Sequence, residues 1–426
     1  MLALGVTRQR LTAFAGVYGS VALGMLASLV ALRVLGPSGG GRYTIVIGAT
    51  DFVAALVWLT SADAVVKYGF RYAASGDWGR FHRLIRLAFG GEVAAALLAT
   101  VLIVALAPLA SSIFKHGGGL AVPLLVAATL PPLQAFESIA AASLFLAGRY
   151  DVRGSWLTLS MGLRLAGVAV GAQFGVTMAV VGVVAAQVVT TVSILGIGLA
   201  TLRRFPPAEP VALGADARPI GRFVAQSAAY TGLISVRTWV APLTLGIVRN
   251  ATAVGLFRAA SMPLTATAAL SAPVRMILLT EQTRDWEHGR RDVVVAGLRR
   301  YVTGSAALAL VGIGPALLAV PFVIRVLLTS KYLPAVPAAR LVVCAAAIQL
   351  VFSWTKTFPV TIGRPGLRLI AHGVETAVML PAIVVLGSEW GVTGAGAAVL
   401  ISSVAFALTW AGILLRLQRT GSLATA

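Results

Sequence analysis

The sequence predicts an all-α polytopic membrane protein of about twelve transmembrane helices, arranged as two six-helix bundles related by pseudo-two-fold symmetry. Of its 426 residues, 58% are hydrophobic and 11% are charged, and the mean hydropathy is +0.91. A soluble domain carries about 25% charged residues, so this composition cannot cover a surface that faces water. Apolar segments of spanning length recur along the whole chain, and its two halves resemble each other.

Twelve segments have the length, about 20 residues, and the low charge of a helix that crosses a bilayer. They are residues 11–33, 43–69, 87–110, 119–147, 153–173, 177–202, 220–247, 251–280, 301–325, 337–361, 367–388 and 391–415. Residues 11–32 contain no charge, which makes this run longer than the apolar core of a signal peptide. We therefore expect it to be retained as the first spanning helix.

The longest polar stretch, residues 203–219, contains Pro206, Pro207 and Pro210 and joins the two halves. It predicts an N-terminal six-helix bundle over 1–202, a cytoplasmic linker over 203–219 and a C-terminal six-helix bundle over 220–426. Repeats of this kind in membrane proteins flank a transport pathway at their interface. Six spans in each half keep both copies the same way up, so the predicted symmetry axis runs along the membrane normal.

Short motifs recur half a chain apart, which indicates duplication. Gly148-Arg149 recurs as Gly363-Arg364 at an offset of 215 in the numbering, and Gly175-Val176-Thr177 recurs as Gly391-Val392-Thr393 at an offset of 216. Upstream, Gly41 and Gly255 match at an offset of 214. The register of the Gly148 and Gly175 matches therefore differs by only one position.

The formal net charge is +20, from 34 Lys and Arg against 14 Asp and Glu. On a soluble chain this excess would indicate nucleic acid binding. Here most of the basic residues fall in loops on the side of the membrane that carries the N-terminus. The positive-inside rule then places both termini in the cytoplasm. The basic inner face is expected to contact anionic lipid headgroups, and no nucleic acid partner is expected.

A few basic side chains lie within or beside the spans, where a buried Arg or Lys costs about 2.5 kcal/mol or more unless it meets a partner or water. They are Lys67, Arg164, Arg237, Arg258, Arg275, Arg340 and Lys356. The last two lie near span ends, where the long stem reaches the interface. The candidate substrate-binding cations are therefore Lys67, Arg164, Arg237, Arg258 and Arg275.

Three of these candidates carry specific expectations. Matching Gly76-Asp77-Trp78 with Arg284-Asp285-Trp286, an offset of 208, places Arg275 where Lys67 lies, and two such cations facing one cavity would hold a diphosphate. Arg237 shares a polar stripe with Gln226, Tyr230 and Thr244, and this stripe is expected to be a wet face of the seventh span.

Four acids, Asp51, Asp63, Glu92 and Glu137, are candidates for proton or sodium coupling. Each also has a simpler interpretation. Asp63 can pair with Lys67 one turn along the same helix, and Glu137 can pair with Arg164 on the neighbouring span. Asp51 and Glu92 can hydrogen-bond to a neighbouring helix instead of binding an ion.

The sequence shows no constellation for catalysis. Its four histidines lack metal-ligand spacing, its single cysteine lies in an apolar segment, and it contains no phosphate-binding loop. We therefore expect no metal, no nucleotide and no cofactor beyond a coupling ion, and no enzymatic activity. Pro242, Pro263 and Pro273 lie inside the seventh and eighth spans, where they permit bends that could serve alternating access.

Two motifs resemble a known family. Arg33-Val34-Leu35-Gly36-Pro37, followed by Gly41-Arg42-Tyr43, resembles the R-x-L-G-P…G-x-Y signature of bacterial polysaccharide flippases. These proteins belong to the multidrug, oligosaccharidyl-lipid and polysaccharide exporter superfamily. The run Asp63 to Tyr68 resembles the end of the second span in that family, with Lys67 where Arg is commoner.

The resemblance implies a V-shaped pair of six-helix bundles around a positively lined cavity. It further implies translocation of a polyprenyl-diphosphate-linked oligosaccharide across the bacterial cytoplasmic membrane by alternating access. Related peptidoglycan-precursor flippases usually carry two additional C-terminal helices, whereas this chain ends after the twelfth predicted span. This difference favours an exopolysaccharide, O-antigen or similar glycan.

Two other functions remain open. A cation-coupled drug or metabolite exporter of the same superfamily would be expected to carry more acids than bases within its spans, which is the reverse of what this sequence shows. A membrane-embedded glycan polymerase would be expected to carry a long external loop with catalytic groups. The predicted spans leave no such loop.

Overall fold

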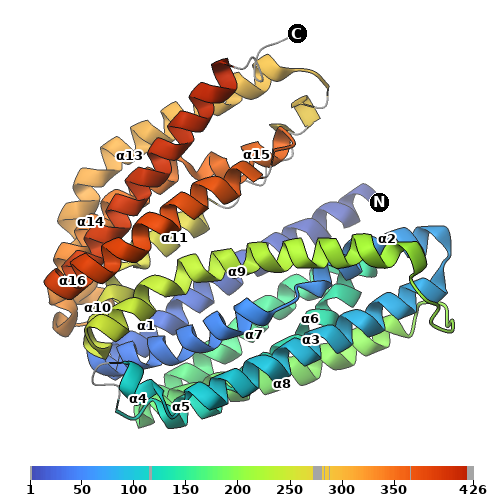
Figure 1. Ribbon diagram of the computed structural model, residues 1–426, viewed down its shortest axis with the longest axis horizontal. Helices are drawn as coiled ribbons and strands as arrows, with labels where there is room; N and C mark the ends of the chain where they lie inside the picture. The colour runs from blue at the N-terminus through green and yellow to red at the C-terminus, as the bar shows by residue number, and fades with distance from the viewer. Residues whose placement is uncertain are drawn as a thin grey trace. The chain divides into compact units, whose positions relative to one another are not determined.

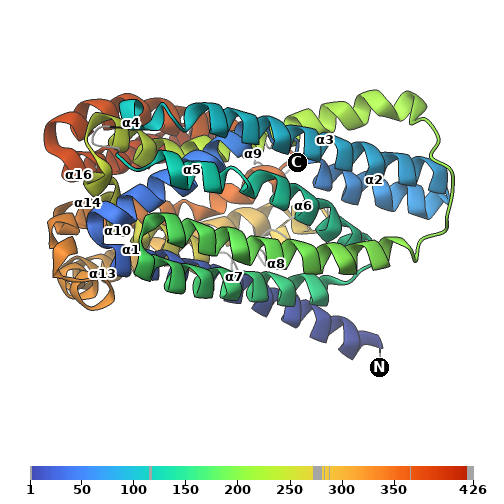
Figure 2. The same ribbon diagram turned by 90° about the horizontal axis from the view of Figure 1, so that it is seen from below.

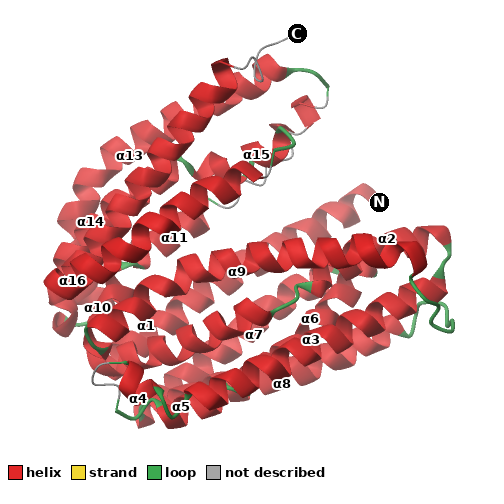
Figure 3. Ribbon diagram, viewed as in Figure 1, coloured by secondary structure: helices red, strands yellow, loops and turns green. Residues whose placement is uncertain are grey.

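The computed structural model describes residues 2–114, 118–271, 281–282, 284–286, 288–364 and 366–419. The chain divides into two compact units, Met1–Leu243 and Thr244–Ala426, and each is described by itself. Every regular element in the described ranges is a helix (Figures 1 and 3). The boundary between the two units falls inside the helix Ala217–Val248, whereas the predicted second copy of the repeat begins after the linker 203–219. The bundle limits 1–202 and 220–426 thus stay a prediction.

The first unit contains nine helices in its described part, and the last of them continues past the unit boundary. They are α1 (Leu2–Val57), α2 (Ser61–Ser75), α3 (Trp78–Leu106), α4 (Ala110–Ile113), α5 (Ala121–Ala127), α6 (Leu130–Leu146), α7 (Tyr150–Gly171), α8 (Val176–Leu202) and α9 (Ala217–Val248). Short 3₁₀ turns, η1 (Ala172–Phe174) and η2 (Gly214–Asp216), precede α8 and α9.

The second unit is helical in the same way. Its described elements are α10 (Ala251–Ala260), α11 (Met262–Leu270), α13 (Arg291–Leu327), η3 (Ser330–Ala335), α14 (Val336–Val351), η4 (Ser353–Lys356), α15 (Phe358–Thr361) and α16 (Gly366–Arg419). The eighth predicted span, 251–280, contains α10 and α11, and its last residues lie outside the described part of the chain.

Within the described residues, nine helices are long and apolar enough to cross a membrane. Two of them join two predicted spans across a single non-helical glycine, Gly36 (φ 69°) in α1 and Gly391 (φ 57°) in α16. Glycine adopts a positive φ without a steric penalty, so each position can redirect the chain between spans. The prediction of an all-α polytopic membrane protein is therefore confirmed.

Glycine-ended helices mark equivalent points in the two halves. Gly148 (φ 69°) follows α6 and Gly363 (φ 70°) follows α15. The amide after each glycine bonds to the carbonyl five residues earlier, at 2.9 Å after Gly148 and 2.8 Å after Gly363. This is the bond that closes a helix in a Schellman motif. The pair has the offset of 215 that the sequence repeat predicts.

The same motif corrects another part of the repeat. Gly76 (φ 70°) and Gly289 (φ 74°) each precede an amide that bonds five residues back at 2.9 Å. The offset between these two glycines is 213, so the predicted offset of 208 is wrong. The match between Asp77-Trp78 and Asp285-Trp286 rested on residue identity alone. The structurally equivalent positions are the positive-φ glycines that end the two helices.

The corrected offset changes the predicted diphosphate pair. With an offset of 213, Lys67 corresponds to Thr280 and not to Arg275. Residues 275 and 280 both lie outside the described part of the chain. The repeat therefore no longer supports a matched pair of cations at these two positions.

Small residues bring helices of the first unit into backbone contact. A Cβ on Gly16 in α1 would lie 2.2 Å from the carbonyl oxygen of Gly154 in α7. A Cβ on Gly167 in α7 would lie 2.3 Å from the carbonyl oxygen of Gly182 in α8. Close approach through small residues is the usual way in which helices pack in a membrane. Helices α7 and α8 run side by side in two orthogonal views (Figures 1 and 2).

The stretch before α9 is packed against the first unit and is not a free loop. The Val211 amide donates to the Gly79 carbonyl at 3.2 Å, and the His82 ring bonds the Pro206 carbonyl at 2.9 Å. The Phe205 ring centroid lies 5.0 Å from that of Phe81. These contacts attach the linker to the turn between α2 and α3 and to the first turns of α3.

Candidate functional site

The first unit contains a cavity of about 350 Å³ between the second part of α1, the break before α2, α6 and α9. Its lining combines two indole rings with hydroxyl, amide and carboxylate groups. The lining residues are Asp51, Ala54, Ala55, Trp58, Thr60, Gln134, Thr231, Ile234, Ser235, Thr238 and Trp239. A cavity of this size with a few polar groups among apolar walls is typical of small-molecule sites.

One face of α9 forms a wall of the cavity. Thr231, Ile234, Ser235 and Thr238 follow one another at spacings of three, one and three residues, which places them on one side of a helix. Trp239 adds its ring at the edge of this face. A Cβ on Gly48 would lie 2.6 Å from Cε3 of that indole, so the absence of a side chain at Gly48 lets the ring pack on α1.

The predicted wet face of α9 is not the face that lines this cavity. Arg237 is half-buried and lies next to Thr238, but it is not among the lining residues. Adjacent positions on a helix point about 100° apart, so the stripe through Tyr230 and Arg237 faces a different direction. Thr231, Ser235 and Thr238 form the polar wall of this cavity, and the wet face through Arg237 stays a prediction.

Lys67 and Asp63 do not form the predicted pair. Both side chains are exposed on α2, and none of the ion pairs within the described ranges joins them. The Lys67 ammonium instead lies 4.4 Å from the centroid of the Phe223 ring and 5.4 Å from that of Tyr68. This cation–π contact places Lys67 between α2 and the start of α9.

Glu137 pairs with Arg153 and not with Arg164. Its Oε1 lies 3.0 Å from the Arg153 guanidinium, and its Oε2 accepts a hydrogen bond from Gln187 at 2.8 Å. Arg153 begins the predicted span 153–173, and its sequence position alone places it among the basic residues on the side that carries the N-terminus. It lies in the first turn of α7, close enough to α6 to reach back to Glu137. Arg164 lies about three turns further along α7 and is half-buried.

The remaining predicted residues are spread over several elements. Asp51 lines the cavity, and Glu92 is buried on α3, where it contacts the start of α2. Arg258 is half-buried on α10 in the second unit. Arg275 lies outside the described residues. None of the predicted cations is among the residues that line the cavity.

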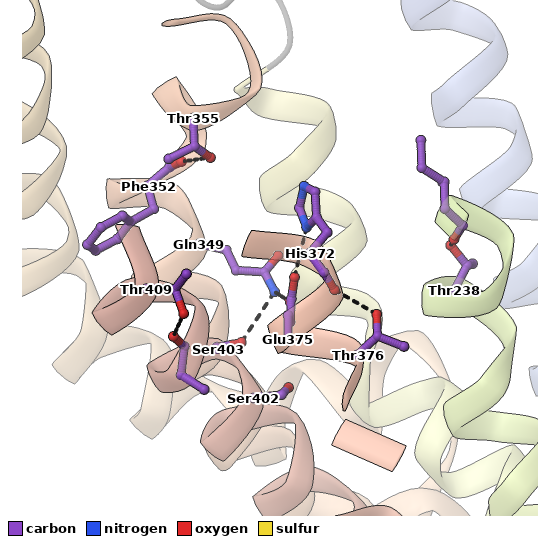
Figure 4. A network of polar contacts seen from close by, with 12 residues as sticks. Thr238, Gln349, Phe352, Thr355, His372, Glu375, Thr376, Ser402, Ser403 and Thr409 are labelled. Carbon is purple, nitrogen blue, oxygen red and sulfur yellow. Dashed lines mark hydrogen bonds and ion pairs between the residues drawn. The ribbon is translucent and has the colours of Figure 1, made fainter. Parts of the chain in front are cut away.

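Sequence reasoning assigned no role to a buried polar network in the second unit (Figure 4). Glu375, 2% exposed on α16, lies 3.0 Å from His372 Nδ1. Gln349 on α14 reaches Glu375 at 3.5 Å and Ser403 at 3.3 Å. The spacing of His372 and Glu375, one turn apart in an apolar span, was the signal that could have revealed it.

The two acidic networks occupy comparable places in the two halves. Gln187 contacts Glu137 in the first unit, and Ser403 contacts Gln349 in the second; the offset from Gln187 to Ser403 is 216, as in the sequence repeat. Both networks join the fourth, fifth and sixth spans of their half. Because each acid is already held by neighbours in its own unit, these networks have the character of internal helix contacts. No group of three or more potential metal ligands occurs among the described residues.

Comparison with solved structures reveals the fold. The structure of lipid II flippase MurJ in an inward closed conformation is 13% identical to this chain in sequence. The match covers 94% of this chain and 87% of that chain, with a TM-score of 0.75. An inward-facing multidrug resistance MATE family transporter of the MOP superfamily is 16% identical, with 95% and 96% covered and a TM-score of 0.70.

A MOP superfamily transporter from Pyrococcus furiosus, reported to have a binding pocket of reverse polarity, is 16% identical, with 97% of both chains covered and a TM-score of 0.62. No family model and no curated protein matches the sequence. At these identities the likeness establishes the fold. The chain therefore has the fold of MOP superfamily transporters along nearly its whole length.

Proposed function

We propose that this chain is an alternating-access transporter that moves a polyprenyl-diphosphate-linked oligosaccharide across the bacterial cytoplasmic membrane for cell-surface polysaccharide biosynthesis. The observation that carries the proposal is the cavity of the first unit, whose walls pair Trp58 and Trp239 with hydroxyl and amide groups. The fold shared with transporters supports a transport function, and the flippase-like signature from Arg33 to Tyr43 supports the substrate class.

The lining groups suit a sugar unit. A sugar ring offers C–H groups to an aromatic face and hydroxyls to side chains that both donate and accept hydrogen bonds. Two indoles, the Thr231 and Ser235 hydroxyls and the Gln134 amide supply both kinds of contact, and the Thr238 hydroxyl, which donates to the Ile234 carbonyl at 2.9 Å, can still accept. The Asp51 carboxylate can accept from sugar hydroxyls but would repel a diphosphate. We therefore assign the sugar, and not the diphosphate, to this cavity.

The diphosphate is assigned to basic side chains outside the cavity. The candidates are Lys67, Arg164, Arg237, Arg258 and Arg275, and the Arg fork suits two phosphate oxygens at once. Three acids within the spans already have partners and so are not free to neutralise these basic side chains. Glu137 is paired with Arg153, Glu375 contacts His372, and Glu92 accepts from Ser61. Membrane lipids surround the transporter, both termini lie in the cytoplasm, and a proton or Na⁺ gradient is the proposed energy source.

A second candidate is a cation-coupled exporter of drugs or metabolites. Asp51 in the same cavity favours it, because a carboxylate beside two indole rings also suits an organic cation. The two candidates differ in what Asp51 does. A sugar site tolerates an amide at this position, since Asn keeps an acceptor, whereas a site for an organic cation loses its counter-charge.

Glycan export in a bacterial strain lacking the gene tests the proposal. Trp239→Ala should reduce surface glycan about tenfold or more, because a stacking platform is lost. Trp390→Ala, which removes an indole that is 64% exposed in the second unit, is the matched control and should export normally. Asp51→Asn should retain most export. Normal glycan export by Trp239→Ala, together with loss of organic-cation efflux in Asp51→Asn, would establish the exporter instead.

A further inference from the structure

The second spanning helix is interrupted beside the cavity. Helix α1 ends at Val57, α2 begins at Ser61, and the three residues between them are non-helical. Thr60 has φ 49° and ψ 35°, and it is the one non-glycine residue with a positive φ in the described ranges. A β-branched residue in this left-handed conformation is strained, so neighbouring contacts must hold it there.

Glu92 supplies such contacts. Its Oε1 accepts the Ser61 backbone N–H at 2.8 Å and the Ser61 hydroxyl at 2.7 Å. Glu92 is 1% exposed, so these bonds form in an environment of low dielectric constant. The N–H groups at a helix start and the helix dipole both favour a negative charge. An ionised Glu92 therefore holds the first turn of α2 in place directly after the strained residue.

The other oxygen of this carboxyl group is not satisfied by the described protein. Glu92 Oε2 and Thr60 Oγ1 are both buried, and neither makes a hydrogen bond of good geometry in the described part of the chain, although the Ala62 backbone N–H also lies close enough to act on this carboxylate. A buried carboxylate with an unpartnered oxygen is costly, and a proton on that oxygen removes the charge. Thr60 also lines the cavity, so the non-helical segment between α1 and α2 borders a space that water can enter.

The charged groups around Glu92 lie on α3 itself, where Arg86 is the nearest in sequence at six residues, and on the helices packed against α3. The elements packed against α3 are α1, α2, α5 and α6. Their charged residues, from residue 15 onward, are Arg33, Arg42 and Asp51 on α1, Asp63, Lys67 and Arg71 on α2, and Glu137 on α6. Of these, Asp63 lies two residues after Ser61 on α2, so its negative charge disfavours a second one on Glu92. Glu137 is already paired with Arg153.

We propose that Glu92 is a proton-binding residue that couples proton uptake to the shape of the second spanning helix. When ionised, it holds Ser61 and keeps Thr60 strained. A proton arriving through the cavity binds Oε2, the charge disappears, and the bonds from Ser61 weaken because they are no longer charge-assisted. The break then relaxes and shifts Trp58 and Thr60, which line the cavity. The inference rests on the proposed transport function only in assigning the coupling ion.

Hydrogen exchange of the full chain in lipid nanodiscs tests the proposal. Between about pH 8 and about pH 5, after correction for intrinsic exchange, the amides of residues 61–63 should lose protection about tenfold or more. Glu92→Gln keeps an acceptor for Ser61 but cannot ionise. Its exchange should equal that of the protonated wild type and should not change with pH.

Asp63→Asn is the matched control, because it removes the neighbouring acid from the same helix and leaves Glu92 to titrate. It should retain the pH dependence of residues 61–63. Ser61→Ala removes one donor to the ionised form, so the midpoint of the transition should move to higher pH. This second variant keeps the test decisive if Glu92→Gln does not fold.

The proposal would be overturned by pH-independent protection in the wild type, or by pH dependence that survives in Glu92→Gln. An unmoved midpoint in Ser61→Ala would also contradict it. The exchange measurement requires no glycan. A wrong substrate assignment therefore appears as failed glycan export with intact proton-dependent exchange, and the two failures can be distinguished.

Discussion

The Tyr72 hydroxyl donates a 2.9 Å hydrogen bond to Asp216, which lies 144 residues later in the chain. Asp216 ends the stretch between α8 and α9, and it also lies 3.6 Å from Arg71 and 3.9 Å from Arg80. One carboxylate thus receives three side chains from the end of α2 and the start of α3. The polar segment that the sequence predicts as a linker is attached to the first unit at this point.

Replacing Tyr72 should loosen this attachment. Tyr72→Phe removes the bond to Asp216 and should cost about 0.5–1.5 kcal/mol of stability, the usual net value of one hydrogen bond. Thermal unfolding in detergent measures the loss. Ser75→Ala, which removes a local bond from the same helix to the Tyr72 carbonyl, is the control and should have a smaller effect. Equal losses in the two variants would argue against a specific attachment.

The same bond predicts a dependence on alkaline pH. Burial, reinforced by the bond to Asp216, raises the pKa of Tyr72 from its ordinary value of 10.0 to about 12. Because the folded pKa is above the unfolded one, the stabilisation is complete below pH 10.0 and is lost as the pH rises toward about 12. Unfolding measured over this window should show the loss in wild type, and Tyr72→Phe should lack that component.

The pair of Arg153 and Glu137 should be important for stability. Their side chains are 18% and 16% exposed, so removing one partner leaves a largely buried charge. Arg153→Ala should destabilise by about 3 kcal/mol, the lower end of the range for buried pairs. Arg149→Ala, whose partner Asp151 is in an exposed pair, should cost less than about 1 kcal/mol. Similar melting temperatures for the two variants would show that the Glu137 pair is not buried in the membrane-embedded protein.

The contact of α7 with α8 predicts that an added methyl group on α8 destabilises the protein at Gly182 but not at Gly196. On Gly182 a Cβ would lie 2.0 Å from the Gly167 carbonyl oxygen, so Gly182→Ala must push the helices apart and should cost about 1–3 kcal/mol. Gly196 in the same helix has no heavy atom within 4 Å of the added position, so Gly196→Ala should be neutral or slightly stabilising. Thermal unfolding of the two variants side by side decides the matter, and a neutral Gly182→Ala contradicts the close approach.

The fold could be predicted because spanning helices depend on length and polarity, both of which are visible in a sequence. The contacts of individual charges could not, because they depend on which helix faces which. From its sequence position, Arg153 would be assigned to a loop. Its pairing with Glu137 depends on the packing of α6 against α7, which the sequence does not show. Arg237 reads as part of a wet stripe, yet the rotation of α9 turns Thr231 and Ser235 toward the cavity.

The repeat shows the same limit. Gly148 and Gly363 were matched correctly because each carries a basic neighbour and each ends a helix with a positive φ. The match of Asp77-Trp78 to Asp285-Trp286 failed because the letters alone do not show where a helix ends. The helix break at Thr60 could not be predicted from the sequence, because a β-branched residue gives no signal for a left-handed conformation.

Arg237 provides the last test of the proposed substrate. If its guanidinium binds the diphosphate, Arg237→Lys keeps the charge but loses the planar fork that engages two oxygens, and export should fall partly. Arg237→Ala loses both and should abolish most export, with the lipid-linked precursor accumulating on the inner leaflet. Arg340→Ala, an exposed basic residue on α14, is the control and should export normally at equal expression. Normal export by an Arg237→Ala, Arg258→Ala double variant would exclude these two side chains from substrate binding, because a diphosphate in a site of low dielectric constant requires a charged partner.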